Sequence, residues 1–438
     1  MFDRRGWRWA PARSPGRRVI ATLRHRDFAL LWTAGVISVA GDFALGIALP
    51  LHAYALTGSA VATGGVFAAS LLPRVLLGSI AGVFVDRWDR KRTMVAADLL
   101  RAALLLPLLV VGSPDLLWLL YLVRAATGVV GLIFDPAESA LLPRLVGEER
   151  LVTANALNAL NNNIGRLVGP VAGGLLYASG GLPAVVIVDA ASFALSAALI
   201  VAIRTSARPE RADDPGDGAS AWGRMINEWR AGLRLVGLDR VLTTIFIAVG
   251  IGFVGEGTFG VGFTPLVIDV LQGGAAGAGI LASAQAIGGL LAGVLVARAA
   301  LTLSPRLLLA GGMIGLGLTD LGVANAAMLA PPGPAAMAVG STFMLLAGFP
   351  VVSSSAAQDG LLQTLTADAY RGRVFGALGA IQGVATLVGL TLGAAAIDAI
   401  GVVPVVSLGA AMWIVGGLFA LTRLSPNVGD ARQGVSVG

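Results

Sequence analysis

Long apolar stretches follow one another along most of the chain, separated by short polar or glycine-rich turns. A helix of about 20 apolar residues crosses a hydrocarbon layer roughly 30 Å thick. The short alternating strands of a membrane barrel do not give this pattern. We therefore predict twelve transmembrane helices, at residues 28–56, 60–85, 93–112, 115–141, 153–178, 183–203, 241–271, 275–298, 306–329, 334–358, 374–400 and 402–423.

The basic residues test this arrangement, because cytoplasmic connections of membrane proteins carry an excess of Lys and Arg. With both termini in the cytoplasm, 27 of the 31 Lys and Arg residues fall in the terminal arms or in the connections on that side. The other four lie within predicted helices: Arg74, Arg101, Arg124 and Arg166. The distribution predicts a multi-pass protein of the cell membrane (the inner membrane where there are two), with both termini cytoplasmic.

The polar connection after the sixth predicted helix divides the chain in two. It begins as a proline-containing stretch typical of linkers. At 222–236, Trp and aliphatic residues recur at helical spacing, which indicates an amphipathic helix on the membrane surface, with a solvated linker as the alternative. The predicted parts are a basic arm at 1–27, a six-helix bundle at 28–203, the linker at 204–240, a second six-helix bundle at 241–423 and a tail at 424–438.

The two predicted bundles resemble each other in sequence. GDFALGIALPL, which begins at Gly41, is similar to GEGTFGVGFTPL, which begins at Gly255. A six-helix unit repeated in tandem is a plan found in secondary transporters. In this alignment Asp42 corresponds to Glu256, so the second half keeps the acid. Gln285 stands in the second half where the first half has Arg74.

Composition narrows the classes of function. Of the 438 residues, 56% are hydrophobic and 13% are charged, about half the charged share of a typical soluble domain. The chain has no cysteine, which excludes disulfides and thiolate metal sites. The net charge of +6 follows from the basic loops, and the glycine runs lie on apolar helices rather than in phosphate loops. We expect no enzyme activity, no cofactor, no metal site and no nucleic-acid partner.

Three motifs resemble those of the major facilitator superfamily. GVFVDRWDRKR, from Gly82, is similar to the family's loop signature G-x-x-x-D-R-x-G-R-[RK]-[RK], with Asp89 in place of the second glycine. RAATG, from Arg124, is similar to R-x-x-Q-G, with Thr127 in place of Gln. GRLVGPVAGG resembles G-x-x-x-G-P-x-x-G-G, the mark of the family's drug/H⁺ antiporters. Its matching residues are Gly165, Gly169, Pro170, Gly173 and Gly174.

Further stretches, FDPAESALLP, ANALN and RGRVFG, look like the subfamily that contains macrolide efflux pumps and the enterobactin exporter. The resemblance implies an all-α fold of two pseudo-symmetric six-helix bundles around a central cavity. It also implies a monomer in the lipid bilayer that exports an amphipathic small molecule, such as a drug or a siderophore, in exchange for protons by alternating access. A lipid or lysolipid flippase on the same fold is one alternative, and a membrane scaffold or sensor without transport is another.

The loop signature that begins at Gly82 contains a cluster of charged residues on the predicted cytoplasmic side. The resemblance implies that Asp86 lies against the start of the eleventh helix, near Val374, and that Arg90 meets Glu138 at the inner end of the fourth helix. Together with Arg87, these residues would form a cytoplasmic gate. The alternative is that the cluster only anchors the loop on the cytoplasmic side.

Acids in the middle of the first and seventh predicted helices are the leading candidates for proton coupling. A charge within the membrane costs about 2.5–3.5 kcal/mol on insertion scales and usually faces the interior of the bundle. Asp42 lies at the depth of Arg74 on the adjacent helix, so the two can form an ion pair. Glu256 has no evident basic partner, and burial favours the protonated form of a carboxylic acid. We expect Glu256 to bind the driving proton or a cationic substrate, with Asp42 as the second candidate.

Three more charged residues lie near one another in the first bundle. Asp98 and Arg101 are three residues apart on the third helix, and Asp135 lies at a comparable depth on the fourth. We expect a local ion network, with a proton relay as the alternative. Arg124 is a coupling candidate because of the resemblance, or else it holds helices together. The glycines of 165–174 allow close helix packing, and either packing alone or sealing during transport explains them.

Overall fold

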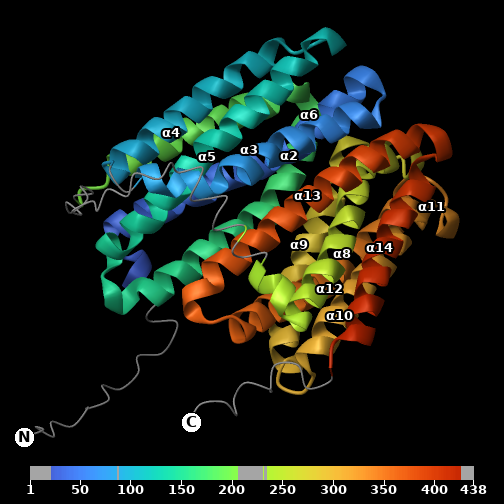
Figure 1. The fold of residues 1–438 in the computed structure, drawn as a ribbon. Coiled ribbons are helices and arrows are strands. Elements are labelled where there is room, and N and C mark those ends of the chain that lie inside the picture. Colours follow the sequence, from blue (N-terminus) through green and yellow to red (C-terminus); the bar gives the residue numbers. More distant parts are fainter. Residues whose placement is uncertain (1–20, 86–87, 206–229, 231–233, 426–438) are drawn as a thin grey trace, which may run out of the picture.

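Within the residues that the computed structural model describes, 21–85, 88–205, 230 and 234–425, the regular elements are helices (Figure 1). The long helices are α2 (Arg26–Thr57), α3 (Ala60–Val85), α4 (Arg90–Leu105), α5 (Leu117–Val146), α6 (Leu151–Val201), α8 (Arg240–Pro265), α9 (Gly274–Ala299), α10 (Pro305–Ala324), α12 (Pro334–Leu365), α13 (Asp368–Ile400) and α14 (Val402–Arg423). The short elements are η1 (Leu106–Val110), η2 (Pro114–Leu116), η3 (Glu148–Arg150), the π-helical η4 (Leu266–Val270) and α11 (Ala326–Leu329).

Eleven helices in the described part of the chain are long and apolar enough to cross a membrane, and together they cover the twelve predicted spans. The difference in number comes from α6, which has 51 residues. At about 1.5 Å per residue it measures about 77 Å, more than two hydrocarbon layers of roughly 30 Å. Its backbone breaks at Gly181, where φ is +64° and ψ is −162°, a conformation open mainly to glycine. The fifth and sixth predicted spans are therefore the two parts of α6.

The tenth and eleventh helices extend beyond the predicted spans by about two turns on the arginine-rich side. The tenth helix, α12, continues to Leu365 rather than ending at residue 358, and α13 begins at Asp368 rather than at residue 374. The added turns carry polar residues such as Asp359 and Arg371. Hydropathy identifies only the part of a helix that suits a hydrocarbon layer, whereas backbone hydrogen bonding continues past it.

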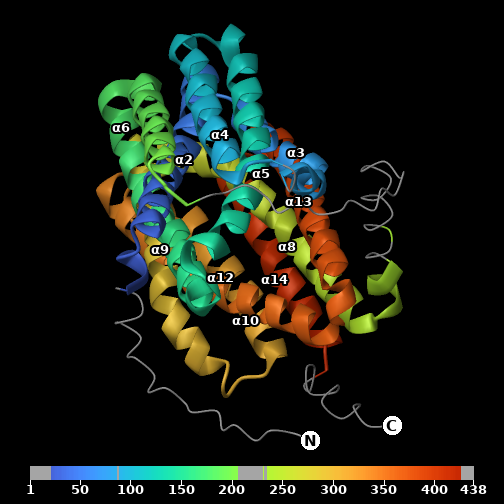
Figure 2. The ribbon, with the colours of Figure 1, turned by 90° about the vertical axis from the view of Figure 1, so that its left-hand side faces the viewer.

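The helices form two groups, α2–α6 and α8–α14, which pack mainly among themselves (Figures 1 and 2). The groups meet chiefly where α6 packs on α9 and α3 packs on α13. The internal repeat relates these two pairs to each other. We call the helix ends beside the basic connections the arginine-rich side, and the opposite ends the arginine-poor side. The described basic residues of the arginine-rich side are Arg24, Arg26, Arg90, Lys91, Arg92, Arg144, Arg150, Arg204, Arg230, Arg234, Arg240, Arg298, Arg306, Arg371, Arg373 and Arg423.

Buried apolar clusters close the arginine-poor side between the two groups. One cluster packs Leu51 of the first group with Leu266 and other residues of the second. Another packs Ala60 of the first group with Leu390 of the second. On the arginine-rich side, each of the clusters found in the described residues draws on one group alone. Because lipid tails are as apolar as these side chains, dispersion and close fit stabilise these contacts in the membrane.

Several predicted features lie outside the described residues. These are most of the basic arm and of the tail, Asp86 and Arg87 of the loop signature, and nearly all of the amphipathic helix predicted at 222–236. From that last segment, Val236 is described, is buried, and packs into the apolar cluster at the arginine-rich ends of α8–α14.

Candidate functional site

A cavity of about 1100 Å³ lies between the two groups of helices. Its walls come from α2, α3, α4, α5 and α6 on one side and from α8 and α9 on the other. It reaches the arginine-rich ends of α5 and α6 at Pro143 and Leu151. Since the bridging clusters close the arginine-poor side, the cavity extends toward the arginine-rich side.

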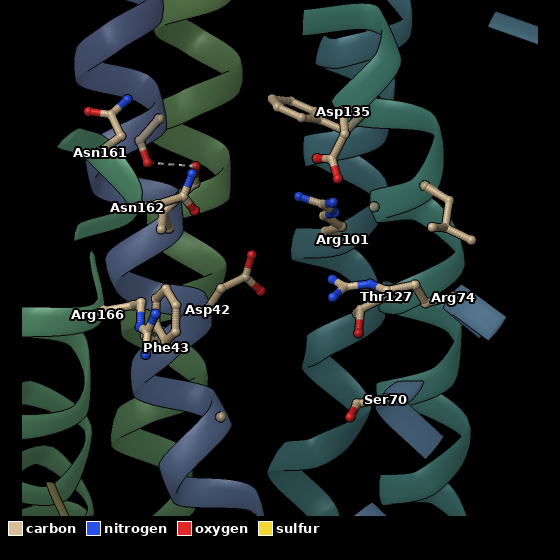
Figure 3. Close-up of a pocket in the computed structure, with 18 of the residues that line it drawn as sticks. Asp42, Phe43, Ser70, Arg74, Arg101, Thr127, Asp135, Asn161, Asn162 and Arg166 are labelled. Carbon is tan, nitrogen blue, oxygen red and sulfur yellow. Dashed lines mark hydrogen bonds between the residues drawn. The ribbon is translucent and has the colours of Figure 1, made fainter. Parts of the chain in front are cut away.

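Charged side chains of the first group face one another across this cavity (Figure 3). Asp42 of α2 points from one wall toward Arg74 of α3 and Arg101 of α4 on the opposite wall. Asp135 of α5 lies above Arg101 in this view. Among the described residues Asp42 and Arg74 form no ion pair within 4.0 Å, so in this conformation the pair allowed by their depth is open. Solvent or a ligand can therefore lie between the two side chains.

Arg101 is held by aromatic rings. Its guanidinium carbon lies 5.2 Å from the ring centre of Phe134 and 5.3 Å from that of Phe193, distances at which cation–π attraction acts. Asp98, three residues earlier, is fully buried and accepts a hydrogen bond of 2.6 Å from Ser196 Oγ. No ion pair within 4.0 Å joins Asp98 to Arg101 in the described chain. The expected network is thus a set of neighbouring charges with separate partners.

The arginine-rich end of the cavity carries Glu138. Its Oε1 accepts a hydrogen bond of 3.2 Å from Asn158 Nδ2 of α6. Arg90, which the family resemblance pairs with Glu138, donates from Nη1 to the carbonyl oxygen of Ala140, 2.9 Å away. Arg90 therefore contacts the end of α5 that the family resemblance predicts. The hydrogen bond found there goes to the backbone carbonyl of Ala140. Arg124 also lines the cavity, farther from this end.

Glu256 and Gln285 belong to the wall formed by the second group. Both also line a smaller cavity of about 230 Å³ among the helices of that group, as does Arg166 of α6. These three residues therefore stand where the two cavities meet. Deeper in the smaller cavity lie Asp320 of α10 and Trp413 of α14.

Three glycines of the antiporter motif bring α6 close to α2: Gly165, Gly169 and Gly173. A methyl group on Gly169 would lie 2.6 Å from the carbonyl oxygen of Ala40, and one on Gly173 would lie 2.6 Å from the Cα of Ala44. Both positions leave no room for a side chain, because the neighbouring atoms belong to the backbone. This part of the motif packs the first group internally.

The rest of the motif faces the second group. A methyl group on Gly174 would lie 2.5 Å from the carbonyl oxygen of Ala275 in α9. One on Gly279 of α9 would collide with the carbonyl oxygen of Pro170. The motif helix is therefore wedged between its own group and the second group, on the arginine-poor side.

A hydrogen bond joins the two groups on the same side. The hydroxyl of Tyr54, near the end of α2, donates to Oδ2 of Asp269 in η4. His52, two residues earlier, bonds within its own group, to the hydroxyl of Tyr177 at 3.1 Å and to the carbonyl oxygen of Val111 at 2.8 Å. The Tyr54–Asp269 contact has to break before the groups can separate there.

Sequence reasoning missed three charged residues, although the sequence contained the signal. Asp189 and Asp320 are single acids within apolar runs, the same signal that selected Asp42 and Glu256. Asp189 is fully buried and accepts a hydrogen bond of 3.2 Å from Ser192 Oγ. Arg166 lies inside the antiporter motif, and the sequence identified it only as a charge within a predicted helix.

The cavities offer charge and hydrogen-bond complementarity to a small organic molecule. In the described residues no group of three or more His, Cys, Asp or Glu side chains is placed to hold a metal ion. The lining combines carboxylates and guanidinium groups with amides and aromatic rings. Such a lining can orient an amphipathic ligand through a few polar contacts within apolar walls.

Comparison with known sequences points to one family. The model of the Major Facilitator Superfamily matches residues 31–390. Macrolide efflux protein A of Streptococcus pyogenes is 27% identical over 386 residues, which cover 86% of this chain and 90% of that protein. Multidrug efflux pump Tap of Mycobacterium bovis is 27% identical over 385 residues, covering 85% and 87%. An MFS-type transporter of Mycobacterium tuberculosis is 30% identical over 373 residues, with 81% of each chain covered.

Solved structures agree on the fold. A bacterial homologue of the iron transporter ferroportin superposes with a TM-score of 0.70 at 17% identity, over 92% of this chain and 99% of that one. The nucleoside transporter NupG gives 0.71 at 13% identity, over 91% and 98%. The relatives named here are transporters, which agrees with the prediction that the chain is not an enzyme. With a family match that spans the helices of both groups, the chain belongs to the Major Facilitator Superfamily of membrane transporters.

Proposed function

We propose that this transporter exports an amphipathic small molecule from the cytoplasm in exchange for protons. The observation that carries the proposal is the central cavity, which both groups of helices line and which is sealed on one side only. A cavity of about 1100 Å³ is slightly larger than the usual range for small-molecule sites, roughly 300–1,000 Å³. Relatives named for the efflux of macrolides and of multiple drugs support an outward direction.

Alternating access follows from where the groups touch. In the proposed cycle the arginine-rich side faces the cytoplasm, so the described conformation admits substrate from inside. Opening outward separates the clusters around Leu51 and Ala60 and breaks the Tyr54–Asp269 hydrogen bond. It brings together the arginine-rich ends, where the loop signature with Asp86, Arg87 and Arg90 acts as the gate. We propose the 28–203 and 241–423 bundles as the two rocking units of a monomer.

Coupling rests on Glu256, with Asp42 as the second acid. Both lie near the middle of their helices and both line the central cavity. In the described chain Glu256 has no ion pair within 4.0 Å. Arg166 lines the same two cavities, and a proton or a ligand can neutralise Glu256 by direct contact. A membrane potential of 100 mV supplies about 2.3 kcal/mol per charge, or roughly 50-fold accumulation per proton. One coupling proton therefore suffices for useful export.

The test is accumulation of a panel of dyes and drugs in cells with and without the protein, repeated with a protonophore. The proposal predicts lower accumulation of at least one compound when the protein is present, and loss of that difference with the protonophore. Export that persists without a proton gradient favours a lipid flippase or another uncoupled transporter. No flux of any compound or lipid favours a scaffold or sensor.

Orientation has its own test. Single cysteines at Ser59, Ser179 and Ser220 are treated with an impermeant maleimide in intact cells. Cytoplasmic arginine-rich loops predict labelling at the first two positions and protection at the third. Labelling at Ser220 alone would reverse the proposed orientation and with it the direction of transport.

A further inference from the structure

The smaller cavity holds a buried acid that the coupling scheme does not use. Asp320 is 3% exposed and faces this cavity, not the central one. The described chain offers its carboxylate no hydrogen bond and no ion pair. Desolvating an ionised carboxylate without a partner is costly, so Asp320 either carries a proton or pairs with an occupant that supplies positive charge.

The charges around the cavity leave one negative charge over. Glu256 and Asp320 contribute two carboxylates, and Arg166 contributes one guanidinium at the junction with the central cavity. No Lys or Arg of α8–α14 lines the smaller cavity in the described residues. A ligand with a single positive charge balances the site.

The rest of the lining suits an organic cation better than a metal ion. Trp413 and Phe253 line the cavity, with ring centres 5.5 Å apart at an interplanar angle of 57°. Aromatic faces attract ammonium groups. Trp413 Nε1 is buried, makes no hydrogen bond within 3.5 Å and is directed toward Glu256, and its side chain faces the same cavity. The described residues hold no cluster of three or more His, Cys, Asp or Glu for a metal.

We propose that the smaller cavity binds the protonated or quaternary amine of the transported molecule, with Asp320 as its counter-ion, while the apolar body of that molecule occupies the central cavity. The size agrees: about 230 Å³ corresponds to several waters at about 30 Å³ each, enough for a substituted ammonium group. This inference deepens the proposed function and relies on it for the direction of transport. A cation bound at Asp320 also stabilises the ionised form of nearby Glu256, which disfavours protonation of that acid. Binding of the substrate and binding of the proton therefore compete.

The test is binding of benzyltrimethylammonium and its neutral isostere neopentylbenzene to the full chain in lipid nanodiscs, by equilibrium dialysis. Counter-ion recognition predicts that the cation binds about tenfold more tightly than the isostere. Asp320→Asn removes the difference, whereas Asp359→Asn, the same change at an exposed site of α12, keeps it. Equal affinity of the two ligands for the wild-type chain overturns the proposal. So does unchanged cation binding by Asp320→Asn, or displacement of the cation by Mn²⁺ at equal concentration.

If Asp320→Asn does not fold, tryptophan fluorescence gives a second test of cation binding in the smaller cavity. Bound cation should change the emission of Trp413, so the wild-type chain should respond and Trp413→Phe should not. An identical response of both chains places the cation elsewhere and overturns the proposal. Neither measurement needs a proton gradient: loss of cation preference with intact protonophore-sensitive export leaves the export proposal standing. Intact cation binding without any export leaves the amine site standing.

Discussion

The two walls of the central cavity differ in how their charges are balanced. The wall from α2–α6 carries acids together with Arg74, Arg101 and Arg124. The wall from α8–α14 carries Glu256, with Asp320 behind it, and no Lys or Arg of these helices lines either cavity in the described chain. Apart from Arg166 at the junction with the smaller cavity, the described first wall has as many acids as arginines, the acids being Asp42, Asp135 and Glu138. The second wall depends on a charge from elsewhere: Arg166 of the first group, a proton or a ligand.

The internal repeat shows how this difference arises. The acid is kept at equivalent positions, Asp42 and Glu256, while Gln285 replaces the base that the first half has at Arg74. The second half therefore carries the acid without a base at the position equivalent to Arg74. We infer that the second wall does the ion chemistry and that the first wall supplies a fixed electrostatic frame.

Replacing the unbalanced acid should have the largest effect. Glu256→Gln removes the charge that the proton neutralises, so uphill export should fall by the roughly 50-fold that one proton supplies at 100 mV. Accumulation of neutral and cationic compounds in energised cells measures this, and downhill exchange should remain. Asp42→Asn, on the balanced wall, is the comparison and should lose less. Full uphill export by both variants removes these acids from coupling and directs attention to Asp135 and Arg124.

Restoring the missing base should make the two walls alike. Gln285→Arg places a guanidinium near Glu256, and an attraction of about 2 kcal/mol at an effective dielectric constant of about 20 corresponds to about 30-fold weaker proton or cation binding. Uphill export measured over a range of substrate concentrations should fall accordingly. Gln285→Met, similar in size and uncharged, should keep most of the activity. Equal loss in both variants would assign the effect to shape, not charge.

Adding a methyl group at the Gly279 contact between α9 and α6 should favour opening of the arginine-poor side. In Gly279→Ala the new methyl group meets the carbonyl oxygen of Pro170, and overpacking costs about 1–3 kcal/mol, or about fivefold or more in the population of the closed form. Maleimide labelling of Ala60→Cys, at a position 2% exposed in a bridging cluster, should speed up by that factor. Gly293→Ala, on the same helix with nothing within 4 Å, should not change it. Equal rates in both variants would contradict the close-contact explanation.

Removing one hydrogen bond between the groups should have the smallest effect. Tyr54→Phe loses the bond to Asp269, worth about 0.5–1.5 kcal/mol, so labelling of Val405→Cys in a bridging cluster should rise by about twofold to about 13-fold. Tyr121→Phe loses a bond of 3.0 Å to the carbonyl oxygen of Ala62 within one group and should leave the rate unchanged. A response of the same size in both variants means that general loosening, not separation of the groups, was measured.

Helix positions followed from the sequence because the length and hydropathy of a span are local properties. The second span matched α3 at both ends, and the turn predicted around Gly181 contains the break in α6. The polar extension of α12 to Leu365 did not follow, because hydropathy is silent on helix beyond the hydrocarbon.

Site residues were predictable as candidates but not as partners. An acid in an apolar run identifies Asp42 and Glu256, and applied throughout it identifies Asp320 as well. Which charges meet is set by packing between helices distant in sequence, such as the Tyr54–Asp269 contact across 215 positions. The open gap between Asp42 and Arg74 depends on the conformation, which no local pattern encodes.

The most direct test of the account is proton movement driven by substrate. The purified chain is reconstituted into sealed liposomes with a pH-sensitive dye inside, and an exported compound from the cell assay is added without any pH gradient. The account predicts that entry of the compound drives proton efflux in the wild-type chain and that Glu256→Gln transports the compound with no proton movement. Transport by the wild-type chain without any change in internal pH would contradict the account.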